Sequence, residues 1–210
     1  MSLENKRRTE IINKLKDSTT PFQDLALEIF EYQFAFNPIY QRYCLFLEKT
    51  PDSVGQMPEI PFLPISFFKE FKIQTGSWEP QVIFQSSGTS GMTPSEHLLR
   101  DKRWYSDSSV RTFETMFGLL DEFAILALLP SYLEKGNSSL VFMVEQFMKR
   151  SANPENGFFL HDTDALISSL KDLKDKGQKT LLIGVSYALL DLKEKIAPEF
   201  DQLMVVETGG

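Results

Sequence analysis

The sequence predicts an α/β fold in which a mainly parallel sheet is flanked by helices and preceded by a helical N-terminal portion. Three observations support this fold class. Strand-like and helix-like segments alternate over residues 76–210, which is typical of parallel sheets built from βαβ units. Phe123–Leu129 is a continuous apolar run, as expected of a strand buried on both faces. Residues 1–75 show helical spacing and end in a Pro-rich connector, so we expect a domain boundary there.

Three helices are expected in the N-terminal portion. Residues 10–15 form a short amphipathic helix. Thr20 is the expected N-cap of the second, with Pro21 at its first helical position and Gln23 completing a capping box. Asn37 is the expected cap of the third, which ends before Thr50. Because three prolines follow closely, residues 57–65 should be extended and not helical.

The C-terminal portion is expected to hold five strands separated by helices. The predicted strands are 81–85, 123–129, 158–160, 180–185 and 203–206, and the predicted helices are 101–117, 138–149, 162–176 and 187–196. Ser138 or Asn137 should cap the helix that begins there. Right-handed crossovers between such strands give a mainly parallel sheet.

Composition excludes several classes of protein. The 22 Lys and Arg against 29 Asp and Glu give a net charge of −7, which makes a nucleic-acid partner improbable on electrostatic grounds. One cysteine excludes a disulfide framework and a Cys-based metal site, and two distant histidines form no short ligand motif. No apolar run is long enough to span a membrane and the first residues lack a signal peptide's apolar stretch, so a cytoplasmic location is expected.

Polar segments follow the five predicted strands. In open α/β sheets, ligands bind beyond the carboxyl ends of the strands. The segments at those ends are rich in small, hydroxyl-bearing or polar residues, and together they should form one rim: 86–91, 130–132, 161–162, 184–187 and 207–210.

The first of these segments carries the strongest signal. It places four hydroxyls and two glycines in six residues: Ser86, Ser87, Gly88, Thr89, Ser90 and Gly91. Glycines let backbone N–H groups turn toward an anion, and hydroxyls add further donors to phosphate oxygens. The spacing is neither that of a Walker A loop nor GxGxxG. A flexible Ser/Gly turn is the alternative interpretation.

This segment resembles the phosphate-binding loop of adenylate-forming enzymes, which activate carboxylic acids as acyl-AMP. Ile60–Lys69 and Leu128–Glu134 are similar to segments of one branch, the acyl-protein synthetase (LuxE) family. Gly184–Leu189 resembles a segment of the related phenylacetate-CoA ligases, in which Glu207–Gly210 would fall at an adenine-contacting loop. The resemblance spans about residues 20–210 and covers the N-terminal part of such enzymes.

The resemblance implies ATP-dependent activation of a fatty or related carboxylic acid, with transfer of the acyl group to a thiol. It implies ATP with Mg²⁺, and an acyl-accepting or reductase protein as a possible partner. Ser86–Gly91 would hold the ATP phosphates. The nucleotide and acyl pocket would include His161, Ser186, Tyr187, Glu207, Thr208, Gly209 and Gly210. Glu207 is favoured because an acid closing a buried strand needs a partner or a ligand.

Two departures from the family pattern leave alternatives open. The loop lacks the usual Pro-Lys continuation, and the nearest cations are Arg100, Lys102 and Arg103. The family's metal-binding acid, ribose-binding aspartate and catalytic lysine would fall after Gly210, so the chain is expected to be truncated and no catalytic or metal residue is assigned. The alternatives are a phenylacetate-type acid–CoA ligase and a non-catalytic nucleotide- or acyl-binding fragment.

Some further residues have two interpretations. Cys44, at helical spacing, is expected to be a buried small hydrophobe and not a nucleophile. His97 could donate to a phosphate or belong to the structure. Four aromatic residues around the Pro-rich segment could line an acyl tunnel, although core packing is the simpler interpretation: Phe62, Phe67, Phe68 and Phe71.

Overall fold

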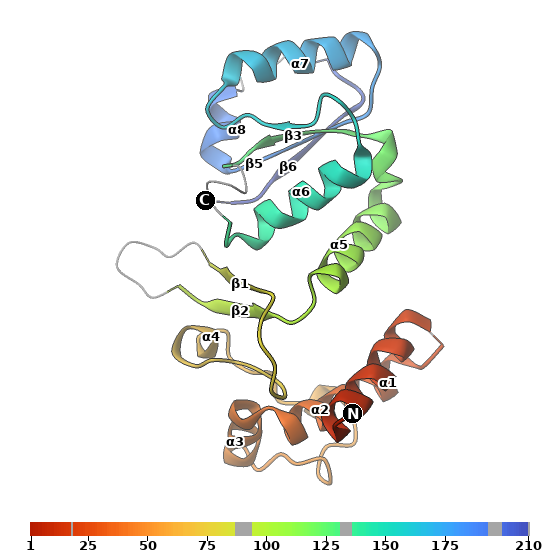
Figure 1. Cartoon of the computed structure of the whole chain (residues 1–210), viewed down its shortest axis with the longest axis vertical. Coiled ribbons are helices and arrows are strands. Elements are labelled where there is room, and N and C mark those ends of the chain that lie inside the picture. The colour runs from red at the N-terminus through yellow and green to blue at the C-terminus, as the bar shows by residue number, and fades with distance from the viewer. Residues whose placement is uncertain (18, 87–93, 131–135, 193–198, 210) are drawn as a thin grey trace. The chain divides into compact units, whose positions relative to one another are not determined.

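The computed structural model describes residues 1–17, 19–86, 94–130, 136–192 and 199–209, and it divides into two compact units (Figure 1). The first unit is Met1–Arg100 and the second is Asp101–Gly210. The division therefore lies after Arg100, whereas the sequence predicts it after residue 75. Each unit is described by itself below.

The second unit is built on a parallel sheet of four strands in the order β4-β3-β5-β6. The strands are β3 (Ala124–Leu128), β4 (Gly157–Phe158), β5 (Thr180–Gly184) and β6 (Leu203–Glu207). All four had been expected, with slightly different ends. The central strands β3 and β5 are buried along their whole length, which explains the apolar sequence of β3 and the apolar residues 181–183 of β5.

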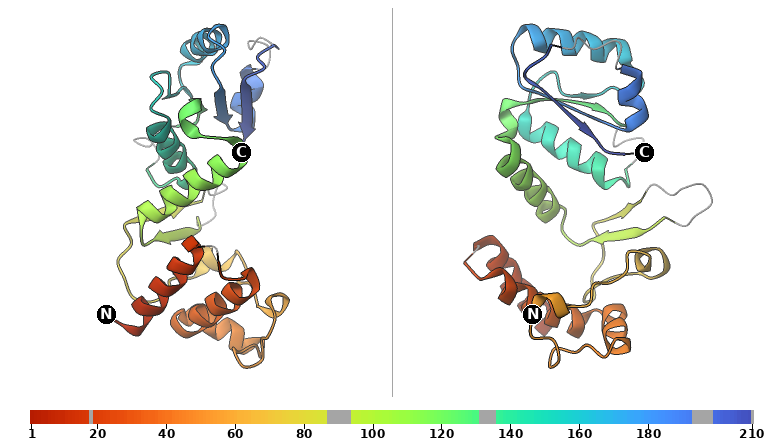
Figure 2. Two further views of the ribbon diagram at one scale, coloured as in Figure 1. Left: turned by 90° about the vertical axis from the view of Figure 1, so that its right-hand side faces the viewer. Right: turned by 180° about the vertical axis from the view of Figure 1, so that it is seen from behind.

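Helices cover both faces of this sheet, as expected. The helices are α5 (Lys102–Phe117), α6 (Ser139–Ser151), α7 (Thr163–Asp175) and α8 (Ser186–Leu192), with the 3₁₀ turn η2 (Leu120–Glu122). Ile125 and Ala127 pack in one core with residues of α5 and α6, while Leu126 and Leu128 pack with residues of α7 and α8. Figure 1 shows α6 and α7 on opposite sides of the strands, and Figure 2 shows the same layers from two further sides. Alternate residues of each central strand thus contribute to opposite cores.

The predicted first strand is not part of this sheet. β1 (Val82–Gln85) pairs antiparallel with β2 (Glu96–Leu99) in a separate two-stranded sheet of the first unit, with Val82 opposite Leu99. The expectation of five strands in one mainly parallel sheet is therefore wrong. An antiparallel partner nearby in the chain satisfies the backbone groups of β1 without a crossover helix, and sequence reasoning had not recognised 96–99 as a strand.

Helices dominate the rest of the first unit. They are α1 (Leu3–Asp17), α2 (Phe22–Phe36), α3 (Pro38–Phe46), the 3₁₀ turn η1 (Met57–Glu59) and the short α4 (Phe67–Glu70). Asn37 caps α3 as predicted, since its side chain accepts a hydrogen bond from the Tyr40 amide at 3.1 Å. The predicted cap of α2 is wrong: Pro21 occupies the N-cap position and no side-chain cap bond forms. The expectation that residues 57–65 contain no helix is wrong only where they form the 3₁₀ turn η1.

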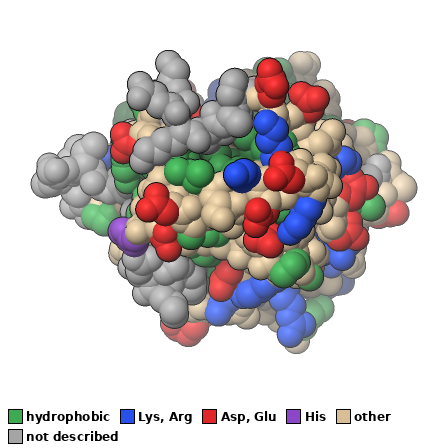
Figure 3. All heavy atoms as spheres, turned by 90° about the horizontal axis from the view of Figure 1, so that it is seen from above, with side chains coloured by type: hydrophobic (Ala, Val, Ile, Leu, Met, Phe, Trp, Pro, Cys, Tyr) green, Lys and Arg blue, Asp and Glu red, His purple; other side chains and the backbone are tan. Residues whose placement is uncertain are grey.

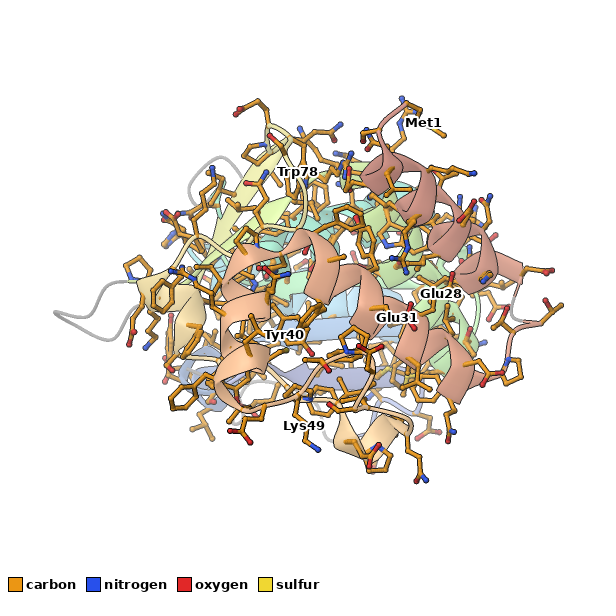
Figure 4. All side chains as sticks on the ribbon, turned by 90° about the horizontal axis from the view of Figure 1, so that it is seen from below. Met1, Glu28, Glu31, Tyr40, Lys49 and Trp78 are labelled. Atoms are coloured by element: carbon orange, nitrogen blue, oxygen red, sulfur yellow. The ribbon has the colours of Figure 1, made fainter. Side chains whose placement is uncertain are left out.

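Ion pairs and a buried cluster tie α1 to the rest of this unit. Lys14 Nζ lies 2.6 Å from Glu28 Oε2, and Arg7 lies 3.3 Å from Glu31; Figure 4 shows both glutamates on α2. Glu4 is buried, accepting a hydrogen bond from Tyr32 at 2.6 Å and pairing with Arg100 at 2.9 Å. Arg100, one of the cations considered for phosphate binding, is therefore engaged in a structural ion pair.

Candidate functional site

The carboxyl ends of β5 and β6 bring four of the predicted site residues together. Gly184, at the end of β5, pairs with Glu207, at the end of β6. The hydroxyl of Ser186, the first residue of α8, donates a hydrogen bond to Glu207 Oε1. The backbone N–H of Gly209 donates to the same oxygen at 2.9 Å. We call Ser186, Glu207, Thr208 and Gly209 the rim cluster.

Backbone contacts hold the rim cluster in place. The amide and the hydroxyl of Thr208 both donate to the Gly184 carbonyl, at 3.0 and 3.2 Å. Gly209 has a φ of +72°, a conformation that favours glycine. The chain leaving β6 is therefore bonded back to the end of β5, which sets the position of the Glu207 carboxylate.

Glu207 is an ionised acceptor at the surface. The hydrogen bond from Ser186 and then that from Gly209 lower the pKa of its carboxyl group. The residue is exposed, because β6 is an edge strand whose burial is incomplete. The reason for favouring it, an acid closing a buried strand, is therefore wrong, although it does have hydrogen-bond partners within the protein.

His161 follows the end of a different strand from the residues of the rim cluster, whereas Tyr187 lies beside them on α8. His161 is exposed in the turn after β4, which forms the opposite edge of the sheet from β6. Three strand spacings separate those edges, or roughly 14 Å. Tyr187 lies next to Ser186 on α8 with 57% of its surface exposed. The predicted pocket is thus divided between two places on the sheet.

The predicted phosphate loop begins on the first unit's small sheet. The amide of Ser86 donates to the Ser95 carbonyl at 3.0 Å, and its hydroxyl accepts from the Ser95 amide at 2.9 Å. Ser86 therefore extends the β1–β2 pairing and does not follow a strand of the parallel sheet, which corrects the prediction. Ser87, Gly88, Thr89, Ser90, Gly91 and Gly210 lie outside the described residues.

An apolar pocket of about 490 Å³ lies within the helical part of the first unit. Its walls come from α1, α2, α3, η1, α4 and the Pro-rich segment, and include Leu25, Ile29, Phe30, Ile60, Phe62 and Phe68. Phe62 and Phe68 had been considered for an acyl tunnel. Phe67 and Phe71 instead form a row with Tyr43: the ring centroids lie 5.6 Å apart for Tyr43 and Phe67 and 5.2 Å apart for Phe67 and Phe71. His97 stacks on Phe68 at 4.7 Å.

Cys44 is fully buried in the core of α2 and α3, as the sequence predicts. Burial raises the pKa of its thiol, so little thiolate is present near neutral pH. We expect Ellman's reagent at pH 8 to label the folded protein at least about 100-fold more slowly than the urea-unfolded chain. Equal rates in the two states would show that the thiol is accessible.

The described residues show neither a metal centre nor a membrane span. In these ranges, no three His, Cys, Asp or Glu side chains gather closely enough to hold a metal ion. None of the helices that the structure describes is both long and apolar enough to cross a membrane. Figure 3 shows acidic and basic side chains interspersed over the face that it presents.

Comparison with known protein families, with curated proteins and with solved structures found no match to this chain. The site is therefore interpreted from its own geometry and chemistry.

Proposed function

We propose that this protein activates a fatty or related carboxylic acid with ATP, forming an acyl-adenylate whose acyl group passes to a thiol. The observation that carries the proposal is the rim cluster at the carboxyl edge of a parallel sheet. This edge is the usual place for nucleotides in open α/β sheets. The resemblance of the loop 86–91 and of residues 60–69 to acyl-protein synthetases supports the same reaction.

The chemistry of the rim cluster suits the sugar side of a nucleotide better than its phosphates. An ionised carboxylate repels phosphate oxygens, but it accepts hydrogen bonds from hydroxyl groups. Glu207 is ionised and held by Ser186 and Gly209, so it suits the ribose hydroxyls of ATP. Mg²⁺ accompanies ATP as part of the substrate.

The reaction needs close positioning of two substrates. An oxygen of the carboxylic acid attacks the α-phosphorus of ATP, the bond to the β-phosphate oxygen breaks, and pyrophosphate leaves. The thiol then attacks the acyl carbon and releases AMP. We assign no residue of this chain to proton transfer, and its part in the proposal is to bind and orient the substrates.

Acid-dependent exchange of pyrophosphate into ATP tests this proposal. With the purified protein and a panel of carboxylic acids, we expect exchange with at least one acid. Glu207→Gln should reduce it roughly 10-fold or more, since hydrogen bonds to a charged acceptor are stronger than those to a neutral one. Asp201→Asn, which removes an exposed acid in the turn before β6, is the matched control.

The exchange experiment also separates the alternatives. No exchange with any acid contradicts an acid-activating enzyme and leaves the non-catalytic fragment. If Glu207→Gln and Asp201→Asn change the rate of exchange equally, the rim cluster has no part in the mechanism. Release of AMP that requires coenzyme A indicates the phenylacetate-type ligase in place of the acyl-protein synthetase.

A further inference from the structure

We propose that the apolar pocket of the first unit binds an unbranched aliphatic chain. The inference deepens the proposed function: identifying the bound aliphatic chain as the acyl part of the acid substrate rests on that function. The binding itself is argued from the pocket alone.

The size and lining of the pocket are those of a small-molecule site. Its volume of about 490 Å³ lies within the range of roughly 300–1,000 Å³ found for ligand pockets. None of the described residues that line it carries a charge, and most are aliphatic or aromatic. The pocket therefore favours an apolar ligand, because a buried charge would lack an opposite charge in the walls.

The polar side chains in the lining already bond to one another or to the backbone. The Tyr40 hydroxyl donates to the Pro61 carbonyl at 2.7 Å. The Asn37 amide donates to the Thr75 hydroxyl at 3.2 Å, and that hydroxyl donates to the side-chain carbonyl of Gln33. These groups stabilise the walls, so the recognition left to the pocket is mainly apolar contact.

Two large side chains of the lining are exposed to solvent. Phe22 and Phe62 are 74% and 76% exposed, although both also line the pocket. They mark its opening, where the polar head of a ligand can remain in water while the tail lies inside. A ligand with a polar head and an unbranched aliphatic tail satisfies both features, because its head can stay in water while its tail contacts uncharged, mainly apolar walls.

Calorimetric titration of the full chain without ATP tests this inference. The probes are hexanoate, octanoate, decanoate and dodecanoate, together with the primary alcohols of the same lengths. Each added methylene should tighten binding about fourfold until the pocket is full, from the free energy of burying a CH₂ group. Acid and alcohol of equal length should bind similarly, because the walls carry no charge.

A matched pair of substitutions on α2 locates the binding. Ala26 lines the pocket, whereas Ala35 is exposed on the same helix outside it. Ala26→Trp should weaken decanoate binding at least about 10-fold by filling the cavity, and Ala35→Trp should leave it unchanged. If Ala26→Trp does not fold, Ala26→Leu provides the same test, because it should move the affinity maximum to a shorter chain.

Three results would overturn the inference: no binding of any probe, no dependence on chain length, or equal effects of Ala26→Trp and Ala35→Trp. Failure here and failure of the proposed function are distinguishable. Pyrophosphate exchange without chain-length-dependent binding refutes the pocket assignment alone. Chain binding without exchange supports the pocket and refutes the acid-activation proposal.

Discussion

Replacing Glu4 by alanine is expected to lower the free energy of unfolding of the first unit by about 2–4 kcal/mol. Glu4 Oε1 accepts hydrogen bonds from both Tyr32 and Arg100, and Glu4 is only 8% exposed. Its removal leaves the Tyr32 phenol without its acceptor and the Arg100 guanidinium without its negative partner, with the Asn5 side-chain oxygen still accepting from it. The value lies below that for a fully buried pair because 23% of the Arg100 side chain is exposed to solvent.

Urea unfolding followed by tryptophan fluorescence measures this loss. Trp78 lies beside Arg100, with the guanidinium 5.6 Å from the ring centroid, so it reports on this unit in a Trp104→Phe background. Glu10→Ala removes an exposed acid from the same helix and should change the free energy by less than about 0.5 kcal/mol. Similar losses for the two variants would show that the buried pair contributes nothing specific.

Replacing Gly184 by valine is expected to destabilise the second unit by about 3 kcal/mol or more. A Cβ at this position would lie 2.8 Å from the Leu128 Cβ and 3.2 Å from the Leu189 Cγ. Leu128 pairs with Gly184 where the two central strands end, so its Cβ cannot move without moving the strand. The Gly184 carbonyl also accepts both hydrogen bonds from Thr208, so the rim cluster should be disturbed as well.

Thermal and urea unfolding of the second unit, followed by Trp104 fluorescence, check this expectation. Gly184→Ala should give a smaller loss of about 1–3 kcal/mol, because alanine adds the crowded Cβ alone. Gly55→Val, in the first unit, is the control: a Cβ there meets its nearest atom only at 4.0 Å, so it should leave the unfolding of the second unit unchanged. A Gly184→Val protein as stable as the wild type would show that β3 and β5 separate easily.

The cores of the second unit could be predicted from the sequence because they depend on local composition. β3 is an unbroken apolar run and β5 is apolar over residues 181–183, and only strands covered on both faces can bury such residues. Caps were equally readable where a side chain bonds within its own turn, as Asn37 and Ser138 do. The prediction that Thr20 caps α2 is wrong because that helix begins one residue later, after Pro21.

The partner of β1 could not be predicted in this way. A four-residue strand with mixed burial is compatible with a parallel or an antiparallel neighbour. The choice depends on whether the following chain forms a second strand, and 96–99 carries only a weak strand pattern. Because β1 pairs with β2, Ser86 at the start of the predicted phosphate loop follows a strand of the small antiparallel sheet and not of the parallel sheet.

The sequence by itself determined the fold class and the candidate residues at the strand ends, because apolar composition and periodicity are local properties. Only the tertiary structure decided which candidates meet. Ser186 and Glu207 come together because β5 and β6 are neighbours in register, whereas His161 follows β4 at the far edge. For the apolar pocket, the sequence offered Phe62 and Phe68 as candidates, but only packing brings the separate segments of its walls together.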